Sequence, residues 1–159
     1  MAVDMFLKLD GIKGESKDHK HKDEIHIESF SWGMSQTGAH GTGGGGGAGK
    51  VNVHDISVTK HVDKSSPVLM LDCASGKHIK EGLITVRKAG DKPVEYLKIK
   101  LTDILVSSVQ FAGHGSDLLT ENLTLNFSKF AVDYIEQKPD GSGEAPVTMG
   151  WDVKANQKA

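Results

Sequence analysis

The spacing Gly44-x-x-x-x-Gly49-Lys50 is that of a nucleotide phosphate-binding loop. Such a loop needs a serine or threonine after the lysine to hold Mg²⁺, and a helix whose N-terminus faces the phosphates. Here Val51 occupies the hydroxyl position, and the alternating residues after it predict a strand. These residues do not favour nucleotide binding, and we expect no nucleotide or other cofactor.

The chain has 8 histidines, which raises the question of a metal site. His19 and His21 lie in a lysine-containing segment, and the others are spread over predicted strands and turns. They come without a Cys-x-x-Cys pair, a His-Glu-x-x-His motif or a cluster of acidic residues. We interpret them as surface residues and expect no functional metal; weak metal binding by His19 and His21 stays open.

Two groups could supply a nucleophile. Cys73, the one cysteine, lies on the apolar side of a predicted helix and is expected to be a small buried hydrophobe. The run Gly113-His114-Gly115-Ser116-Asp117 brings serine, histidine and aspartate together. Members of a catalytic triad must converge from separate elements, so this run predicts a turn. With no Gly-x-Ser-x-Gly motif either, the sequence predicts that the protein is not an enzyme.

Composition excludes several partners. The 159 residues carry a net charge of −2, which creates no field that would attract nucleic acid or an anionic membrane. In the segment Lys13–Glu24 lysines and carboxylates balance, which predicts a solvated loop. No stretch has the length of a membrane-spanning helix, so we expect no membrane insertion. Asp4 and Lys8 interrupt the apolar start of the chain, so no signal peptide is predicted and synthesis in the cytoplasm is expected.

The elements that must position these residues are mostly strands. One short helix is predicted to begin at Ser65-Ser66-Pro67, which supplies an N-cap and a proline in the first turn, and to end before Gly76. The fold class expected is mainly β, a barrel or sandwich of antiparallel strands with one flanking helix, in one domain over residues 1–159. Alternating polar and apolar residues predict strands over Met5–Leu9, Asp23–Met34, Val51–Val62, Gly82–Lys88, Val94–Thr102, Ile104–Phe111, Leu119–Phe127, Phe130–Gln137 (pairing with the preceding strand or continuing it) and Val147–Val153.

A glycine-dominated run, Gly41–Gly49, divides the first predicted strands. Glycine loses the most backbone freedom on ordering, and hairpin loops usually need only about two to five residues. We therefore expect a partner subunit to order this run, so that assembly is the function; the alternative is a disordered loop. A monomeric carbohydrate-binding module, with Trp32 or Trp151 stacking on sugars, is a further alternative.

Many motifs in order resemble one family, the haemolysin-coregulated protein (Hcp), the tube subunit of the bacterial type VI secretion system. The resemblance covers essentially the whole chain. It rests on Ala2–Lys8, Lys13–Ser16, Phe30–Ser35, Gly43–Val51, Lys60–Ser66, Cys73–His78, Val86–Gly90, Val106–Val109, Leu119–Phe127 and Gly150-Trp151.

The resemblance implies a β-barrel of two antiparallel sheets with a flanking helix, six copies of which form a ring around a pore. Stacked rings would form a tube that a contractile sheath drives out of the cell, with a spike protein as a further partner. The pore would hold, protect and deliver small effector proteins, so the subunit would itself be secreted. A phage-type tail-tube protein of a contractile injection particle shares this fold and is the main alternative.

The resemblance also assigns residues. Ser29 and Ser31, on one face of the predicted strand Asp23–Met34, are expected in the pore wall, with Ser31 as a contact to cargo. The alternative for Ser31 is an ordinary strand hydroxyl with satisfied hydrogen bonds. The glycine run occupies the place of an extended loop that reaches the neighbouring ring, through Gly43, Gly44, Gly45, Gly46, Gly47 and Gly49.

Overall fold

A computed structural model describes residues 3–38, 49–90 and 93–159. The described chain is mainly β, as predicted, with antiparallel strands in a nine-stranded and a two-stranded sheet. The elements are β1 (Val3–Leu9), β2 (Ile25–His26), β3 (Ser29–Ser31), β4 (Met34–Gln36), β5 (Val51–Val53), β6 (Ile56–His61), α1 (Ser66–Ser75), β7 (Ile79–Lys88), β8 (Glu95–Ala112), β9 (Thr120–Tyr134), β10 (Val147–Asp152) and β11 (Gln157–Lys158).

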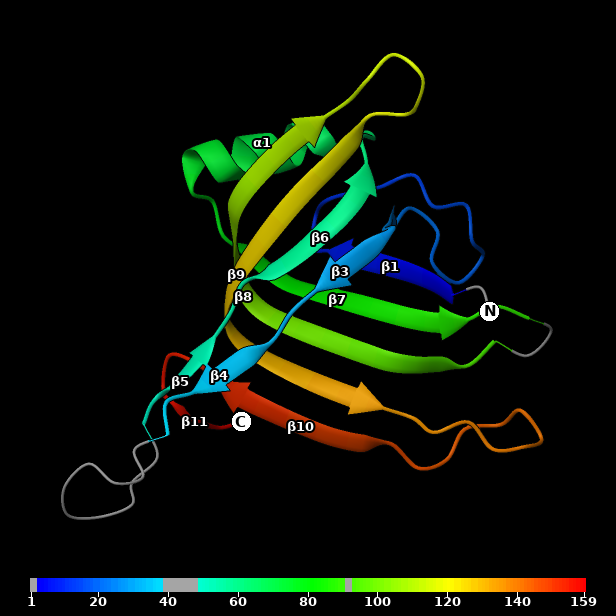
Figure 1. The fold of residues 1–159 in the computed structure, drawn as a ribbon, viewed down its shortest axis with the longest axis vertical. Helices are drawn as coiled ribbons and strands as arrows, with labels where there is room; N and C mark the ends of the chain where they lie inside the picture. The colour runs from blue at the N-terminus through cyan, green and yellow to red at the C-terminus, as the bar shows by residue number, and fades with distance from the viewer. Residues whose placement is uncertain (1–2, 39–48, 91–92) are drawn as a thin grey trace.

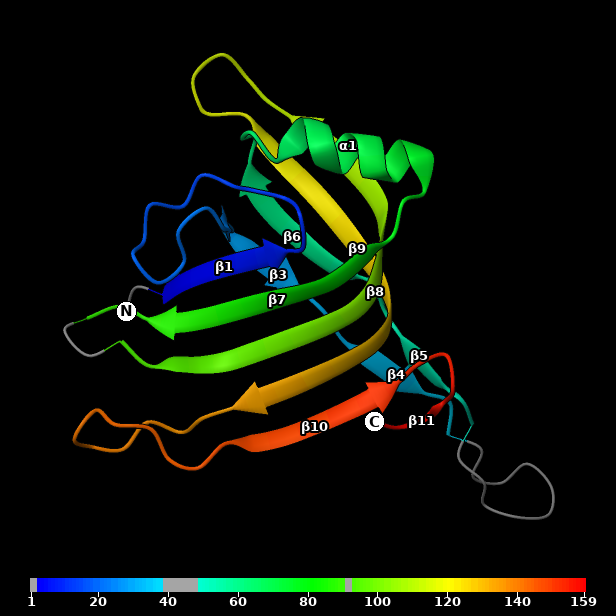
Figure 2. The ribbon, with the colours of Figure 1, turned by 180° about the vertical axis from the view of Figure 1, so that it is seen from behind.

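The larger sheet folds into two layers because β8 and β9 are long enough to belong to both. In the first layer the strand order is β11-β10-β9-β8-β7-β1-β2. In the second layer the other halves of β8 and β9 pair, and β9 continues through β6 to β3. Figures 1 and 2 show the layers diverging from the bend that β8 and β9 share, with α1 at the same end as the β8–β9 turn.

The layers do not close into a barrel, so this part of the prediction was wrong. The strand predicted over 23–34 is divided: β2 pairs with β1, whereas β3 pairs with β6. Between them Ile27 N–H donates to the Met5 carbonyl (3.1 Å) and Glu28 N–H to the Thr59 carbonyl (2.8 Å). The chain therefore changes partner within two residues. The strand predicted over 51–62 is likewise divided, because β5 leaves the layers to pair with β4.

The bend of β8 and β9 reverses which residues face outward. Asp103, with φ of 55°, lies between the pairs Thr102–Lys129 and Ile104–Phe127. Before the bend, even-numbered residues of β8 point away from the core; after it, Ile104 and the next even-numbered residue are buried. A bend of this kind lets one strand serve two packed sheets. Four predicted strands are consequently two, and the prediction that Phe130–Gln137 continues its predecessor is confirmed as far as Tyr134.

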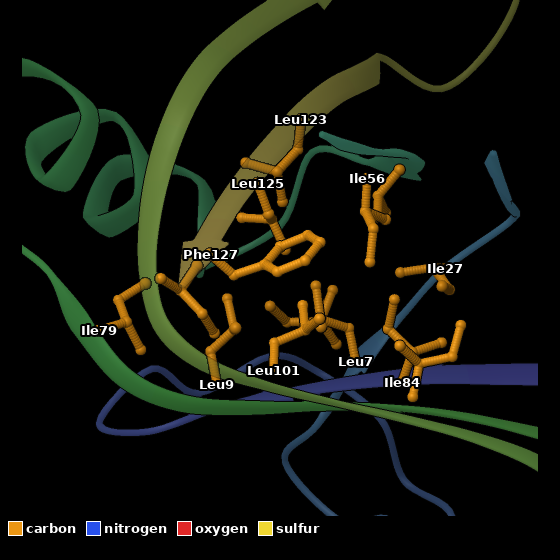
Figure 3. Packing of buried hydrophobic residues seen from close by; sticks show 14 of the residues in the cluster. Leu7, Leu9, Ile27, Ile56, Ile79, Ile84, Leu101, Leu123, Leu125 and Phe127 are labelled. Atoms are coloured by element: carbon orange, nitrogen blue, oxygen red, sulfur yellow. The ribbon is translucent and has the colours of Figure 1, made fainter. Parts of the chain in front are cut away.

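The hydrophobic core fills the space between the layers (Figure 3). Leu7 and Leu101 from the first layer and Leu123 and Leu125 from the second are fully buried and point toward one another. Burial of such apolar area is the main stabilising term of the fold. Because strand side chains alternate, the intervening residues of these strands are left to form the outer surfaces.

Helix α1 is confirmed at both ends, and Ser65 occupies its N-cap position. Gly76 takes the left-handed conformation (φ 72°) and ends the helix, as expected. Ser65 makes no side-chain cap hydrogen bond. The Asp63 carboxylate is the stronger acceptor: it accepts the Ser65 hydroxyl and the Ser65 N–H (2.9 Å).

A buried ion group holds α1 against the second layer. The Lys60 Nζ lies 2.9 Å from Glu121 Oε1, 3.0 Å from Asp63 Oδ1 and 3.2 Å from Ser66 Oγ. The side chains of Lys60 and Glu121 are both 0% exposed. The ammonium therefore joins β6, β9 and the first turn of the helix in one polar contact.

The segment Lys13–Glu24 is not simply a solvated loop, which corrects that expectation. The buried Arg87 donates to Asp18 (2.6 Å) and Asp4 (3.0 Å) and lies over the Phe6 ring. His21 is buried and stacks on the Phe6 ring itself, with ring centroids 4.3 Å apart. The interpretation of the histidines as surface residues is therefore wrong for His21, because its segment is pinned to the first layer.

These contacts lower the pKa values of two carboxyl groups, those of Asp18 and Glu95. The hydrogen bond from Arg87 holds the pKa of Asp18 well below its usual range, against the small opposing effect of burial. Burial raises the pKa of Glu95, but the hydrogen bond and charge of His21, 2.7 Å away, outweigh it, so the pKa of Glu95 is lowered. Both carboxylates are thereby held in the charged form that ties the segment to the sheet.

Candidate functional site

The outward surface of the second layer consists of short polar side chains, which we call the hydroxyl face. Its residues come from β3, from β6 with Asp55 just before it, and from the adjoining halves of β8 and β9, so that four neighbouring strands contribute to one surface. They are Ser29, Ser31, Asp55, Ser57, Thr59, Ser107, Ser108, Gln110, Asn122, Thr124 and Asn126.

Strand register places these side chains in rows. Ser31 lies beside Ser57, which lies beside Thr124, and Thr124 lies beside Ser108. The hydroxyls of Thr124 and Ser108 are 2.6 Å apart. Cross-strand hydroxyl pairs of this kind stabilise a sheet modestly and satisfy much of its outward hydrogen-bonding capacity. A surface built this way offers weak contacts to a passing molecule.

A β-bulge adds to the density of hydroxyls. The β8–β9 register shifts between Val106 and Ser108, so Ser107 is an extra residue opposite Thr124. Ser107 and Ser108 consequently both reach Thr124, at 2.7 and 2.6 Å, and both are exposed. Without the bulge, one of the two serines would face the core.

The structure describes three of the predicted site residues, Ser29, Ser31 and Gly49. Ser29 and Ser31 are both exposed on β3 and belong to the hydroxyl face; their role toward cargo stays a prediction. Gly43–Gly47 lie outside the described residues. Gly49 is described, and a Cβ there would come within 2.6 Å of Thr37 Oγ1 and 3.2 Å of the Thr37 carbonyl. Glycine at 49 thus allows the chains flanking the run to approach closely.

The candidate nucleophiles do not form a triad. Ser116 Oγ lies 2.8 Å from His114 Nδ1, but the Asp117 carboxylate accepts the Leu118 N–H instead of orienting the histidine. Cys73 is half-buried and packs against the core, so it is less enclosed than expected.

The remaining interpretations to compare with the structure are a metal site, sugar binding by the two tryptophans, and a membrane-spanning helix. Within the described ranges no group of three or more histidine, cysteine, aspartate or glutamate residues could hold a metal. Trp32 donates to the His54 carbonyl (2.9 Å) and meets Phe127 and Phe130 edge-on. Trp151 packs against the core as well, and this placement does not favour sugar stacking. In the part of the chain that the structure covers, no helix is long and apolar enough to cross a membrane.

The two layers are offset, and each leaves part of its apolar side uncovered. At the end of the first layer, Val147 is 73% exposed, with Met34, Tyr134 and Met149 also exposed; we call these four the lower overhang. Beside it Met34 and Met149 line a groove of ≈ 410 Å³ together with Trp151. The indole N–H of Trp151 is buried and, within the described chain, lacks a hydrogen-bond partner.

The second layer ends in a similar way at the opposite end of the molecule (Figures 1 and 2). Phe111, Leu118 and Leu119, around the β8–β9 turn, are 43%, 68% and 52% exposed; we call them the upper overhang. Exposed apolar patches on a folded chain mark interaction surfaces. Here two patches of different composition occupy opposite ends.

Comparisons with known proteins place this β fold in a particular family. The family model described as "Type VI secretion system effector, Hcp" matches residues 6–134. Protein hcp1 of Pseudomonas aeruginosa is 55% identical over 162 residues, covering 100% of both chains. The crystal structure of Hcp1 from Salmonella typhimurium, 37% identical, superposes with a TM-score of 0.81 over 100% of both chains. A structure titled as a type six secretion system protein, 29% identical, gives 0.91 over 99% of this chain and 100% of that one.

The chain therefore belongs to the Hcp family of type VI secretion tube proteins. The resemblance noted in the sequence is confirmed. Its mainly β fold with two antiparallel sheets and a single described helix agrees with those structures.

Proposed function

We propose that this protein is the repeating subunit of the inner tube of a type VI secretion system, with six copies in each ring and rings stacked into a tube. The observation that carries the proposal is the pair of unlike overhangs. A ring needs a heterologous interface, in which one surface of a subunit meets a different surface of the next. The upper and lower overhangs are two such surfaces, at opposite ends of one chain.

The groove beside the lower overhang supports this use. Its walls include Phe130 and Trp151 beside Met149, and apolar side chains entering it would displace water. Leu118 and Leu119 of a neighbouring copy have the size and character to do so.

The hydroxyl face is the proposed wall of the pore. A channel that retains and then releases varied effector proteins needs many weak contacts instead of a few strong ones. Rows of short hydroxyls, largely paired with one another, meet that requirement. Ser31 is proposed as a cargo contact and Ser29 as its neighbour, and Gly43–Gly49 as the loop that contacts the next ring.

The remaining partners follow from the tube role. The outer surface of the ring would meet a contractile sheath, and the end of the tube a spike protein. The subunit would be made in the cytoplasm and leave the cell with the tube and its cargo.

The ring proposal is tested by mixing two interface variants. Met149→Glu blocks the lower overhang and Leu118→Glu the upper one. By light scattering, wild type should have six times the 17.1 kDa chain mass, and each variant alone the mass of one chain. An equimolar mixture should form dimers, because only one intact pair of surfaces remains. Thr148→Glu, on the opposite side of β10, is the control and should leave rings intact. A solitary wild-type chain at high concentration, or variants that still form rings, would contradict the proposal.

A further inference from the structure

We propose that Asp55 makes the hydroxyl face selective for passengers that present lysine or arginine. This rests on the proposed function, because it takes the hydroxyl face as the wall that passengers touch. It adds a class of cargo surface that the wall would prefer.

Hydrogen bonds from two neighbours hold the Asp55 carboxylate in position, but they do not occupy all of its acceptor positions. Its Oδ2 accepts a hydrogen bond from Ser107 Oγ (2.7 Å), and its Oδ1 accepts one from Asn126 Nδ2 (2.9 Å). A carboxylate has about four acceptor positions, so each oxygen keeps capacity for another donor. The side chain is half-buried, which leaves it accessible from the face. A cationic side chain arriving there would meet an oriented acceptor.

The charge of Asp55 is not balanced by a cation on the same face. Among the residues that define the hydroxyl face, Asp55 is the one charged side chain. Lys60, the lysine of β6, points the other way and is 0% exposed in its contact with Glu121. A lysine of a passenger would therefore meet attraction without repulsion, whereas an acidic surface would meet an unneutralised carboxylate.

The border of the face is also acidic in part. Glu28 Oε1 lies 3.3 Å from His61 Nε2 and 3.8 Å from His26 Nε2. Glu28 therefore lies beside the side of β6 that carries Thr59, because His61 and Thr59, two residues apart, point to the same side of that strand. Asp55 differs from Glu28 in having amide and hydroxyl partners instead of titratable ones, so it is the residue to test.

Repetition would amplify a small preference. One partly exposed ion pair changes affinity by about two- to fivefold. In a ring each copy brings its own Asp55 to the same pore, and a passenger with several cationic side chains could engage more than one. The preference should weaken as salt rises, because these charges are open to solvent.

The test uses the assembled full-length protein and two fluorescent peptides, one of alternating lysine and serine and one of alternating glutamate and serine. Binding is followed by fluorescence anisotropy. Wild type should bind the lysine peptide more tightly than the glutamate peptide, and Asp55→Asn should weaken lysine-peptide binding at least twofold. Asp133→Asn, an aspartate of the first layer, is the matched control and should bind as wild type does. Raising the salt concentration should remove the wild-type preference.

Each outcome decides the point. Unchanged lysine-peptide binding by Asp55→Asn, an equal effect of Asp133→Asn, or equal affinity of wild type for both peptides overturns the inference. The same samples are imaged for rings by electron microscopy. If wild type forms no rings, the proposed function itself fails; if rings form and bind without regard to charge, only the selectivity fails. The comparison of the two peptides on wild-type rings needs no variant, so equal affinity for both overturns the inference even if Asp55→Asn assembles poorly.

Discussion

The same two strands, β8 and β9, build two outer surfaces of opposite chemistry. On the second layer they present the hydroxyl face, whose short side chains bond to one another at 2.6 to 2.9 Å. On the first layer they present long charged side chains, among them Lys98, Lys100 and Asp133, which we call the charged face. Its ion pairs are loose: Lys98 lies 3.4 Å from Glu95 and Lys100 3.9 Å from Glu81.

The difference shows that one bend determines both surfaces. At Asp103 the alternation of β8 reverses, and at Ser107 the bulge adjusts it again. A shift of one residue would turn core residues outward on one layer and polar residues inward. The hydroxyl face and the charged face are therefore set by two local backbone features and not by separate domains.

The largest expected effect is on the free energy of unfolding, and it should differ between two lysines. Lys60 lies beneath the hydroxyl face, and Lys100 lies on the charged face. Lys60→Met leaves Glu121 buried without its cation, which should lower the free energy of unfolding by about 3–5 kcal/mol. Lys100→Met, at a side chain 58% exposed, should change it by less than about 0.5 kcal/mol. Urea denaturation measures both. Equal effects of the two substitutions would mean that the Lys60 group does not hold α1 in place.

A medium effect is expected at the inner edge of the charged face. Arg87→Lys keeps a positive charge but loses the two-pronged hydrogen bonds of the guanidinium to Asp18 and Asp4. It should therefore lower the free energy of unfolding by about 1–3 kcal/mol. Limited proteolysis should also cut the segment 13–24 faster in this variant. Lys129→Arg, an exposed position on β9, is the control. Wild-type stability of Arg87→Lys would show that this segment is held by other contacts.

Acid should weaken the same contact. The folded-state pKa of Asp18 is depressed, so its contribution is complete above the ordinary aspartate value of about 4 and is lost as pH falls below it. The free energy of unfolding should therefore decrease below about pH 4. The decrease should be shallower in Arg87→Met, where the cause of the shift is absent. Matching curves for the two proteins would place the acid sensitivity elsewhere.

The smallest change in stability is expected at Ser31, where a substitution should affect effector binding and little else. Ser31→Tyr adds a bulky ring to an exposed position of the hydroxyl face and should change stability by about 0.5 kcal/mol or less. It should nevertheless reduce the amount of co-purifying effector, because the tyrosine side chain obstructs the proposed pore wall. Thr148→Tyr, exposed on β10, should leave effector levels unchanged. Intact rings with normal effector levels in Ser31→Tyr would remove Ser31 from the cargo contact.

Local patterns predicted the elements that obey them. Proline and glycine at the ends of α1, and the strict alternation of Leu123, Leu125 and Phe127, marked a helix and a strand that the structure contains. The bend at Asp103 was missed because a break in alternation is also what separate strands produce. The change of pairing partner between Ile27 and Glu28 was missed because backbone partners cannot be identified from side-chain type.

Contacts between residues that are distant in the chain could not be predicted from the sequence. Lys60 and Glu121 have the composition of a solvent-exposed surface, and only their pairing across β6 and β9 makes burial tolerable. Arg87 and Asp18 are separated by 69 positions, so no local pattern connects them. For the candidate site, the sequence indicated Ser29 and Ser31, but the rest of the hydroxyl face required the register of four strands.

The account is tested most directly by measuring which face lies nearer the ring axis. Spin labels are attached to Ser57→Cys on the hydroxyl face and, separately, to Lys100→Cys on the charged face, both with Cys73→Ala. Distances between copies are then measured by double electron–electron resonance. Because symmetry-related distances in a ring grow with radius, labels at 57 should give shorter distances than labels at 100. Equal or longer distances from position 57, or no distances between copies at all, would contradict a ring lined by the hydroxyl face.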